Sequence, residues 1–190
     1  RRHTRLQGDW SSDVCSSDLM VKKKSQLYKT IFPKHIDDPL TNFSKIIDKI
    51  FIGNQDAAKD SKFFKKYNIK AVVNCTKDIK NYFPENAEYI RLPVNDNLKK
   101  IDFKTMTMYL PSIVEFLYKN VVLDKSNVLV HCAQGRIRSV TVVVCFLIKY
   151  HKMDPIKACL FVLNKRPEAF HYGTSVNFSE SILNFYYNKN

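Results

Sequence analysis

Short apolar runs alternate along this chain with longer stretches in which apolar residues recur every three or four positions. The short runs are typical of strands in a buried sheet, and the longer stretches are typical of helices that cover it. Strands are predicted at 46–52, 69–74, 88–94 and 128–130. Helices are predicted at 25–32, 57–67, 103–118, 136–150, 154–163 and 176–187. This alternation favours an α/β fold with a central mixed, mainly parallel sheet flanked by helices.

The first 19 of the 190 residues differ in character from the rest. The triplet Ser-Ser-Asp recurs at 11–13 and 16–18, and Met20 follows at once. The segment has no helical periodicity and no apolar run long enough for a signal peptide. We interpret 1–19 as a non-native leader that resembles translated adapter DNA, with a genuine leader as the alternative. An N-terminal extension is then expected at 20–44 and a single catalytic domain at 45–190.

The chain is strongly basic. It has 31 Lys and Arg residues against 18 Asp and Glu, a formal net charge of +13. Such a charge favours anionic partners, namely acidic phosphopeptides, nucleic acid or a membrane surface. A lysine- and asparagine-rich composition from an AT-rich genome explains the charge equally well. No stretch reaches membrane-spanning length without charge, so stable membrane insertion is not expected.

Four cysteines follow Met20, at positions 75, 132, 145 and 159. They form no Cys-x-x-Cys pair and show no spacing typical of disulfides. This pattern indicates a reducing, cytoplasmic compartment and argues against a zinc site. Cys145 and Cys159 lie on apolar faces of predicted helices and are predicted to be core residues.

The candidate chemistry lies at 131–139, between a predicted strand and a predicted helix. These residues read His-Cys-Ala-Gln-Gly-Arg-Ile-Arg-Ser. A loop that opens a helix points free N–H groups, and the positive end of the helix dipole, at one spot. A Cys132 sulfur in that position should ionise readily, and the fork of Arg138 can bind two phosphate oxygens. The pair indicates phosphoryl transfer through a phosphocysteine.

At these residues the chain resembles the cysteine-dependent protein phosphatases, whose signature is HCxxGxxR followed by Ser or Thr. Within them it is similar to the compact dual-specificity phosphatases. The resemblance covers about residues 46–186, and its other parts are Ile50-Phe51-Ile52-Gly53, Val72-Val73-Asn74, 92–97 and Lys165-Arg166-Pro167. It implies a phosphotyrosine-phosphatase-like fold with a strand, a phosphate loop and a helix at the active site. It also implies hydrolysis of phosphotyrosine and of phosphoserine or phosphothreonine in a phosphoprotein.

The resemblance and the chemistry assign a role to each residue of the motif. Cys132 is the expected nucleophile, Arg138 holds the transferring phosphoryl group, and Ser139 donates to the departing thiolate. His131 is expected to fix the loop and the thiolate by hydrogen bonding. Backbone N–H groups are expected to bind phosphate oxygens at Ala133, Gln134, Gly135, Arg136, Ile137 and Arg138. A core histidine and a helix-capping serine are the alternatives for His131 and Ser139. The arginine and the N–H groups supply the charge, so we expect no metal and no cofactor.

The leaving group needs a proton, which such enzymes usually take from an aspartic acid on a loop. Asp96 is the expected general acid because it follows the predicted strand 88–94, as in the family, and precedes an asparagine. It lies thirty-six residues before Cys132, and the predicted loop 121–127 would absorb the extra length. Asp102 is the rival, although it lies further from the strand end. A turn residue or a helix cap is the alternative for such an aspartate.

Two loop positions depart from the commonest dual-specificity pattern, HCxAGxSRS. Gln134 stands where alanine is usual, and Arg136 adds a second cation at the pocket mouth, where similar phosphoinositide phosphatases carry a lysine. A phosphoinositide or another highly charged substrate is therefore an alternative. The 5′ phosphate of RNA is a third candidate substrate, with which the net charge of +13 is compatible. For Arg136 itself, the alternative is a solvated residue on the first helical turn. A non-catalytic phosphoprotein-binding module is a further alternative, although Cys132, Arg138 and Asp96 are all present.

Two further features concern redox chemistry and assembly. Cys75 follows the predicted strand 69–74, where the phosphoinositide branch has a cysteine that cross-links to the nucleophile on oxidation. A simple buried cysteine is the alternative. Residues 20–29 look similar to the start of poxvirus dual-specificity phosphatases, which dimerise by exchanging a leading helix. This similarity makes a homodimer one of the two expected states, beside a monomer.

Overall fold

A five-stranded sheet with the order β1-β2-β5-β3-β4 lies at the centre of the structure. The structure is a computed structural model, and it describes residues 22, 41–97, 99–170 and 176–188. The strands are β1 (Phe43–Ile47), β2 (Ile50–Gly53), β3 (Ile69–Asn74), β4 (Glu88–Arg91) and β5 (Asn127–His131). β1 pairs antiparallel with β2, and the pairings β2–β5, β3–β5 and β3–β4 are parallel. The predicted mixed, mainly parallel sheet is confirmed.

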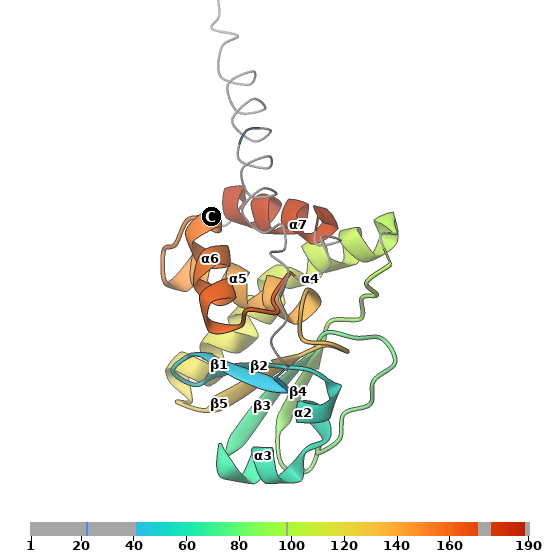
Figure 1. Ribbon diagram of the computed structural model, residues 1–190, viewed down its shortest axis with the longest axis vertical. Coiled ribbons are helices and arrows are strands. Elements are labelled where there is room, and N and C mark those ends of the chain that lie inside the picture. The colour runs from blue at the N-terminus through green and yellow to red at the C-terminus, as the bar shows by residue number, and fades with distance from the viewer. Residues whose placement is uncertain (1–21, 23–40, 98, 171–175, 189–190) are drawn as a thin grey trace, which may run out of the picture.

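Helices cover both faces of this sheet (Figure 1). Two short helices, α2 (Gln55–Lys59) and α3 (Ser61–Lys66), lie on one face. The other face carries α4 (Lys100–Tyr118), α5 (Arg138–Tyr150) and α6 (Pro155–Lys165), and α7 (Val176–Tyr187) packs against α4 and α5. A π-helix, η1 (Lys119–Leu123), continues α4. The sheet is therefore a middle layer, and its inner strands have no face toward water.

The alternation of side chains along the strands builds two apolar cores. Leu129 of β5 points toward α3 together with Phe51 and Val72 of the neighbouring strands. Residues one position away point into the larger core under α4 and α5, which contains Ile50, Ile52, Val73, Val128, Val130, Cys145 and Cys159. A large apolar side chain buried in this way stabilises the fold by about 1.5–3 kcal/mol. The prediction that Cys145 and Cys159 are core residues is confirmed, since both are fully buried.

The predicted strand 46–52 is wrong, because the chain reverses within it. Asp48 and Lys49 form the turn between β1 and β2, and Lys49 has a φ of 67° in the left-handed region. Ile46 and Ile50, on either side of the turn, are both buried. The apolar pattern therefore continues across the turn and conceals it.

The predicted helix 57–67 is two helices separated at Asp60. The carboxylate of Asp60 accepts the N–H groups of Lys62 at 2.8 Å and Phe63 at 3.2 Å, so it caps the N-terminus of α3. Its own N–H donates to the Ala57 carbonyl at the end of α2. Aspartate is a poor residue inside a helix and a good one at its N-cap, which explains the break.

The other predicted elements lie close to the observed ones, with three differences. The strand 88–94 stops at Arg91, shortly before Pro93, which has no N–H for a sheet. The first part of the predicted loop 121–127 is helical, because η1 extends to Leu123. The phosphate-loop helix begins at Arg138 rather than at 136. The predicted helix 25–32 lies outside the described residues.

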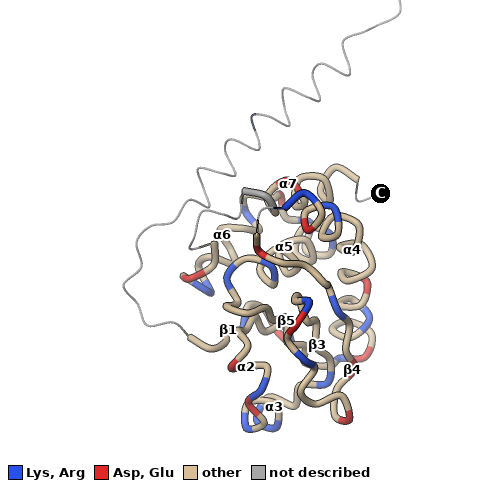
Figure 2. The backbone as a smooth tube through the Cα atoms, turned by 90° about the vertical axis from the view of Figure 1, so that its right-hand side faces the viewer, with Lys and Arg blue, Asp and Glu red and all other residues tan. Residues whose placement is uncertain are grey.

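Basic residues are distributed over much of the described chain, including α3, α4 and α6 (Figure 2). Their spread gives a generally positive surface rather than one isolated basic segment. Among the helices of the described residues, none combines the length and the apolarity needed to cross a membrane.

Candidate active site

The candidate site is the loop between β5 and α5, at the carboxyl ends of parallel strands, where α/β sheets usually bind their ligands. Cys132 follows the last residue of β5, and Arg138 is the first residue of α5. The Gly135 N–H donates to Cys132 Sγ at 3.1 Å, and Ser139 Oγ donates to the same sulfur at 3.5 Å. The structure therefore brings Cys132, Gly135 and Ser139 together around one sulfur.

These contacts favour the thiolate of Cys132. Burial alone would raise the pKa of the Cys132 thiol, since its side chain is almost fully enclosed. The positive charge of Arg138 and the hydrogen bonds from Ser139 and Gly135 outweigh burial and lower this pKa below its ordinary value. Opposite charge and hydrogen bonds to the charged form act in the same direction here. The sulfur is thus prepared as a nucleophile.

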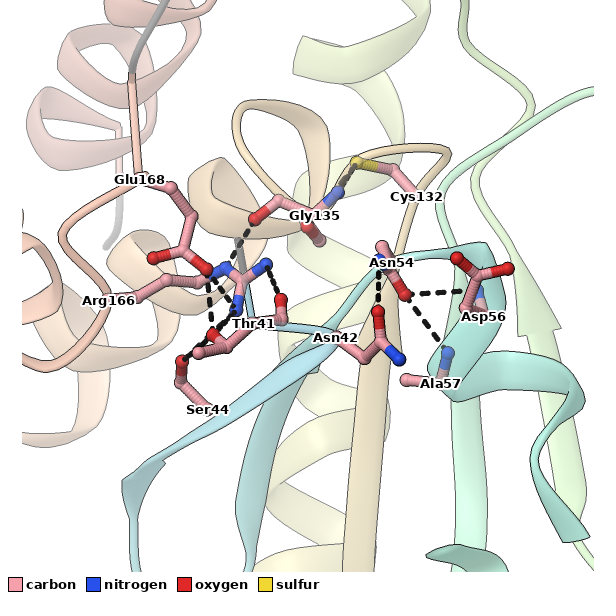
Figure 3. A network of polar contacts seen from close by, with 11 residues as sticks. Thr41, Asn42, Ser44, Asn54, Asp56, Ala57, Cys132, Gly135, Arg166 and Glu168 are labelled. Atoms are coloured by element: carbon pink, nitrogen blue, oxygen red, sulfur yellow. Dashed lines mark hydrogen bonds and ion pairs between the residues drawn. The ribbon is translucent and has the colours of Figure 1, made fainter. Parts of the chain in front are cut away.

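Gly135 occupies a position that no other residue fits. Its φ is 68°, in the left-handed region. A Cβ there would lie 2.6 Å from the carbonyl oxygen of Gly53 and 2.8 Å from Arg166 Nη2. Its N–H meanwhile turns toward Cys132, as Figure 3 shows. The glycine lets the loop turn tightly and press against the end of β2.

Arg166 supports the loop from the opposite side. Its side chain is 1% exposed, and its Nε donates to the Gly135 carbonyl at 2.7 Å (Figure 3). Its Nη1 and Nη2 atoms donate to Ser44 Oγ at 3.0 Å and to the Thr41 carbonyl at 3.2 Å. Glu168 forms an ion pair with Nη1 at 3.0 Å and so balances the buried charge. Arg166 lies within the family-like run 165–167, but no role for it was predicted from the sequence.

A pocket of about 420 Å³ opens above the loop. Its lining residues are Asp96, Cys132, Ala133, Gln134, Arg136, Ile137 and Arg138. Gln134 is exposed, whereas Arg136 is only 5% exposed. The alternative of a solvated Arg136 is therefore wrong, because the side chain is enclosed while it lines the pocket. The pocket combines a nucleophilic sulfur, two guanidinium groups and one carboxyl group.

Asp96 contributes that carboxyl group from the segment after β4. The segment is held beside the phosphate loop by Arg138, whose Nη1 donates to the Val94 carbonyl at 3.1 Å. Asp96 is an exposed residue, but neighbouring atoms partly enclose its carboxyl group where it lines the pocket. This burial raises the pKa of Asp96, while the charge of Arg138 acts against the rise. A raised pKa keeps more of the protonated form, as a proton donor needs.

Asp102, the rival proton donor, lies elsewhere. The residue is 2% exposed and does not line the pocket. Its Oδ1 accepts the Asn95 N–H at 2.8 Å and pairs with Lys77 Nζ at 2.9 Å. Burial would raise the pKa of Asp102, but the Asn95 N–H and the Lys77 ammonium lower it overall. A carboxylate held in its charged form by these partners is poorly suited to donate a proton.

The family model for the dual specificity phosphatase catalytic domain matches residues 50–188. The chain belongs to this family. A dual specificity protein phosphatase of Drosophila melanogaster, Mpk3, is 30% identical over 138 residues, which are 72% of this chain and 32% of that protein. Mouse dual specificity protein phosphatase 18 is 28% identical over 137 residues, which are 72% of this chain and 70% of that protein.

Solved structures show the same fold. The crystal structure of human DUSP28 has a TM-score of 0.64 and 18% identity, and the match covers 79% of this chain and 95% of that one. OH1 from the Orf virus has a TM-score of 0.64 and 16% identity, with 83% and 95% covered. The matched part of this chain thus corresponds to nearly the whole of each of these folded domains, but to only about a third of the Drosophila relative.

His131 is enclosed beneath the phosphate loop. Its side chain is 1% exposed, and burial lowers the pKa of the imidazole to about 4, although a hydrogen bond with the Cys132 backbone acts in the other direction. The ring is therefore neutral at neutral pH. The His131 carbonyl accepts the Cys75 N–H at 2.8 Å, which joins the ends of β5 and β3. The expectation that His131 fixes the loop remains a prediction.

Cys75 lies beside this pair of strand ends and is fully buried. Burial raises the pKa of the Cys75 thiol well above its ordinary value, and the nearby charge of Cys132 raises it further. The pKa values of these two nearby thiols are therefore shifted in opposite directions, down for Cys132 and up for Cys75. Cys132 is disposed to ionise, and Cys75 remains a thiol.

Proposed function

We propose that this chain is a protein phosphatase that hydrolyses phosphotyrosine and phosphoserine or phosphothreonine through a phosphocysteine intermediate. The observation that carries the proposal is the Cys132 sulfur, which accepts hydrogen bonds from Gly135 and Ser139 inside a pocket also lined by Arg138 and Asp96. A nucleophile, a phosphate-binding cation and a proton donor facing one space are the parts this reaction requires.

In the first step, the Cys132 thiolate attacks the phosphorus atom and forms the S–P bond. The bond between phosphorus and the ester oxygen breaks, and its electron pair leaves with that oxygen. Asp96 gives its proton to the leaving oxygen, which departs as the free hydroxyl of the protein side chain. Arg138 and the loop N–H groups stabilise the charge on the transferring phosphoryl oxygens.

In the second step, water attacks the phosphorus of the phosphocysteine. The Asp96 carboxylate, now deprotonated, accepts a proton from this water, and the S–P bond breaks. The sulfur leaves as a thiolate, which accepts a hydrogen bond from Ser139. Inorganic phosphate departs, and the protonated Asp96 and the Cys132 thiolate are restored.

Arg136 favours a second candidate, a phosphoinositide phosphatase. It gives the pocket a guanidinium in addition to Arg138, which suits a substrate with more than one phosphate. An RNA 5′ phosphate is bound by the same chemistry, and the basic surface is compatible with both. We favour the phosphoprotein because the relatives that match this chain bear names of protein phosphatases. A cytoplasmic location is part of the proposal, and a homodimer stays one of the two expected states beside a monomer.

The test is hydrolysis of p-nitrophenyl phosphate by the reduced protein in the presence of EDTA, with wild type beside Cys132→Ser. We expect activity in wild type and none in the variant. Cys145→Ala is the matched control, since it removes a thiol that lies outside the pocket. Full activity in Cys132→Ser would exclude the phosphocysteine, and an inactive but folded wild type would favour the phosphoprotein-binding module.

Substrate class is tested with the same protein on a phosphotyrosine peptide, a phosphothreonine peptide, a phosphoinositide and triphosphate-ended RNA. The protein-phosphatase proposal expects the two peptides to have the highest kcat/KM. A preference for the lipid that disappears in Arg136→Gln would support the second candidate instead.

A further inference from the structure

We propose that Asp102 and Lys77 are positioning residues that hold the general-acid loop against the phosphate pocket. The inference rests on the proposed role of Asp96 and extends it to a pair of residues outside the pocket. The general-acid loop comprises residues 92–97, which follow β4 and include Asp96.

One peptide group of this loop is held on both sides. The carbonyl oxygen of Val94 accepts from Arg138 Nη1 at 3.1 Å. The N–H of Asn95, which belongs to the same peptide group, donates to Asp102 Oδ1 at 2.8 Å. Asp96 is the next residue. The two bonds therefore fix the peptide plane between Val94 and Asn95, just before Asp96. Arg138, at the start of α5, holds one side of this peptide, and Asp102 of α4 holds the other.

Asp102 is itself fixed by its place in α4. It lies in the first turn of the helix, where free N–H groups and the helix dipole favour a negative charge. The same helix is secured in the larger core by Met106 and Leu110, both fully buried. The carboxylate that receives the Asn95 N–H therefore stands on a rigid element rather than on another loop.

Lys77 provides the charge that a buried carboxylate needs. Its Nζ lies 2.9 Å from Asp102 Oδ1, and its side chain is 38% exposed whereas that of Asp102 is 3% exposed. Arg91 holds the backbone around Lys77, since its Nη1 donates to the Thr76 carbonyl at 2.8 Å and the Lys77 carbonyl at 3.3 Å. Removal of Lys77 would leave the buried Asp102 carboxylate without its charge partner, whereas the partly exposed Lys77 would remain solvated if Asp102 were removed.

The general-acid loop has few other backbone restraints among the described residues. Before Asn95, the Leu92 N–H donates to the Asn74 carbonyl and the Val94 N–H donates to the Leu92 carbonyl. After Asp96, the Lys99 N–H donates to Asn97 Oδ1 at 3.2 Å. The Asn95–Asp102 bond is therefore the nearest one on the N-terminal side of Asp96. Proton donation requires the carboxyl group within hydrogen-bond reach of the leaving oxygen, so a small displacement of this loop should slow that step.

The proposal predicts a defect that depends on the leaving group. A nitrophenolate leaves with little help from an acid, whereas the more basic phenolate needs a proton. We expect Asp102→Ala to lower kcat with phenyl phosphate by about tenfold or more, and kcat with p-nitrophenyl phosphate by much less. Asp102→Asn, which keeps an oxygen for the Asn95 N–H, and Lys77→Met should give smaller losses of the same selectivity. The double variant Lys77→Met/Asp102→Asn should lose no more than the worse single variant, since both changes remove one ion pair.

Glu115→Ala is the matched control, because Glu115 is an α4 carboxylate with a lysine partner, Lys149, remote from the loop. The rate of Cys132 alkylation by iodoacetate should be unchanged in every variant, which separates acid-loop displacement from damage to the nucleophile. Equal losses on both substrates in Lys77→Met and Asp102→Asn, or no loss in either, would overturn the proposal.

Asp96→Ala separates failure of this inference from failure of the proposed function. If Asp96→Ala shows the phenyl-selective loss and the Asp102 and Lys77 variants do not, the positioning role is wrong while the acid assignment stands. If Asp96→Ala has no phenyl-selective loss, the acid assignment itself is wrong.

Discussion

Arg166 donates from Nε to the carbonyl oxygen of Gly135 at 2.7 Å, although the two residues are thirty-one positions apart. The N–H of the same glycine donates to Cys132 Sγ at 3.1 Å. One residue therefore connects the nucleophile on one side with a buried guanidinium on the other. The orientation of the Gly135 peptide groups, and with it a hydrogen bond that favours the thiolate, depends on a side chain outside the pocket.

Arg166→Met should therefore raise the pKa of Cys132. The change removes the bond that orients the loop and a positive charge that interacts with the Cys132 thiolate. We expect the midpoint of the pH dependence of iodoacetamide alkylation to move upward by about one pH unit, a cost of roughly 1.4 kcal/mol to the thiolate. Lys165→Met, at the exposed neighbouring residue, is the control. An unchanged midpoint in folded Arg166→Met would contradict this role.

Gly135→Ala should weaken phosphate binding strongly while the protein still folds. Alanine disfavours a φ of 68°, and its Cβ would meet the Gly53 carbonyl oxygen at 2.6 Å, so the loop must change its path. We expect affinity for inorganic phosphate to fall by at least about tenfold, equivalent to roughly 1.4 kcal/mol. Titration calorimetry measures the affinity, and thermal unfolding checks that the protein is folded. Unaltered phosphate affinity would show that the loop tolerates the side chain.

The pH profile of kcat/KM should be bell-shaped. Cys132 must be ionised, so the rate rises as pH increases through its lowered pKa. Asp96 must be protonated, so the rate falls as pH increases through its raised pKa. Asp96→Asn has no titrating carboxyl group at this position, so it should lack the falling limb and keep the rising one. Steady-state rates with phenyl phosphate across the pH range would test this. A falling limb that persists in Asp96→Asn would assign it to another group.

Cys75→Ser should make the enzyme more sensitive to irreversible oxidation. The Cys132 thiolate is the more readily oxidised sulfur, and the neighbouring Cys75 thiol can trap its sulfenic acid as a disulfide with loss of water. After mild peroxide and then dithiothreitol, wild type should recover more activity than Cys75→Ser. Cys159→Ser serves as the control for loss of another buried thiol. Equal recovery, with sulfinic acid on Cys132 in both proteins, would leave Cys75 as a core residue only.

The sequence was most informative where local chemistry decides the structure. Apolar runs identified β3 and β5, and the motif at 131–139 located the phosphate loop because its residues are neighbours in the chain. The hairpin between β1 and β2 was missed because apolar side chains continue on both sides of its turn. The break at Asp60 had a visible signal, since an aspartate before a helical pattern is a typical N-cap.

Long-range contacts could not be read from the sequence. Asp102 looked like a rival acid because spacing does not reveal that it accepts the Asn95 N–H and pairs with Lys77. Arg166 belongs to the family-like run 165–167, but its bond to Gly135 can be predicted only when the position of α6 relative to the phosphate loop is known. The low exposure of Arg136 could not be predicted from the sequence, because an arginine near the start of a helix is usually solvated.

The strand order places β5 between β2 and β3, with all three parallel. The nucleophile thus follows the most internal strand, whose position depends on the cores on both faces rather than on any loop. The segments that surround the pocket leave from other strands and helices. Substitutions in those segments can change which phosphoester is admitted while the sulfur stays in place, so one framework can serve many substrate preferences.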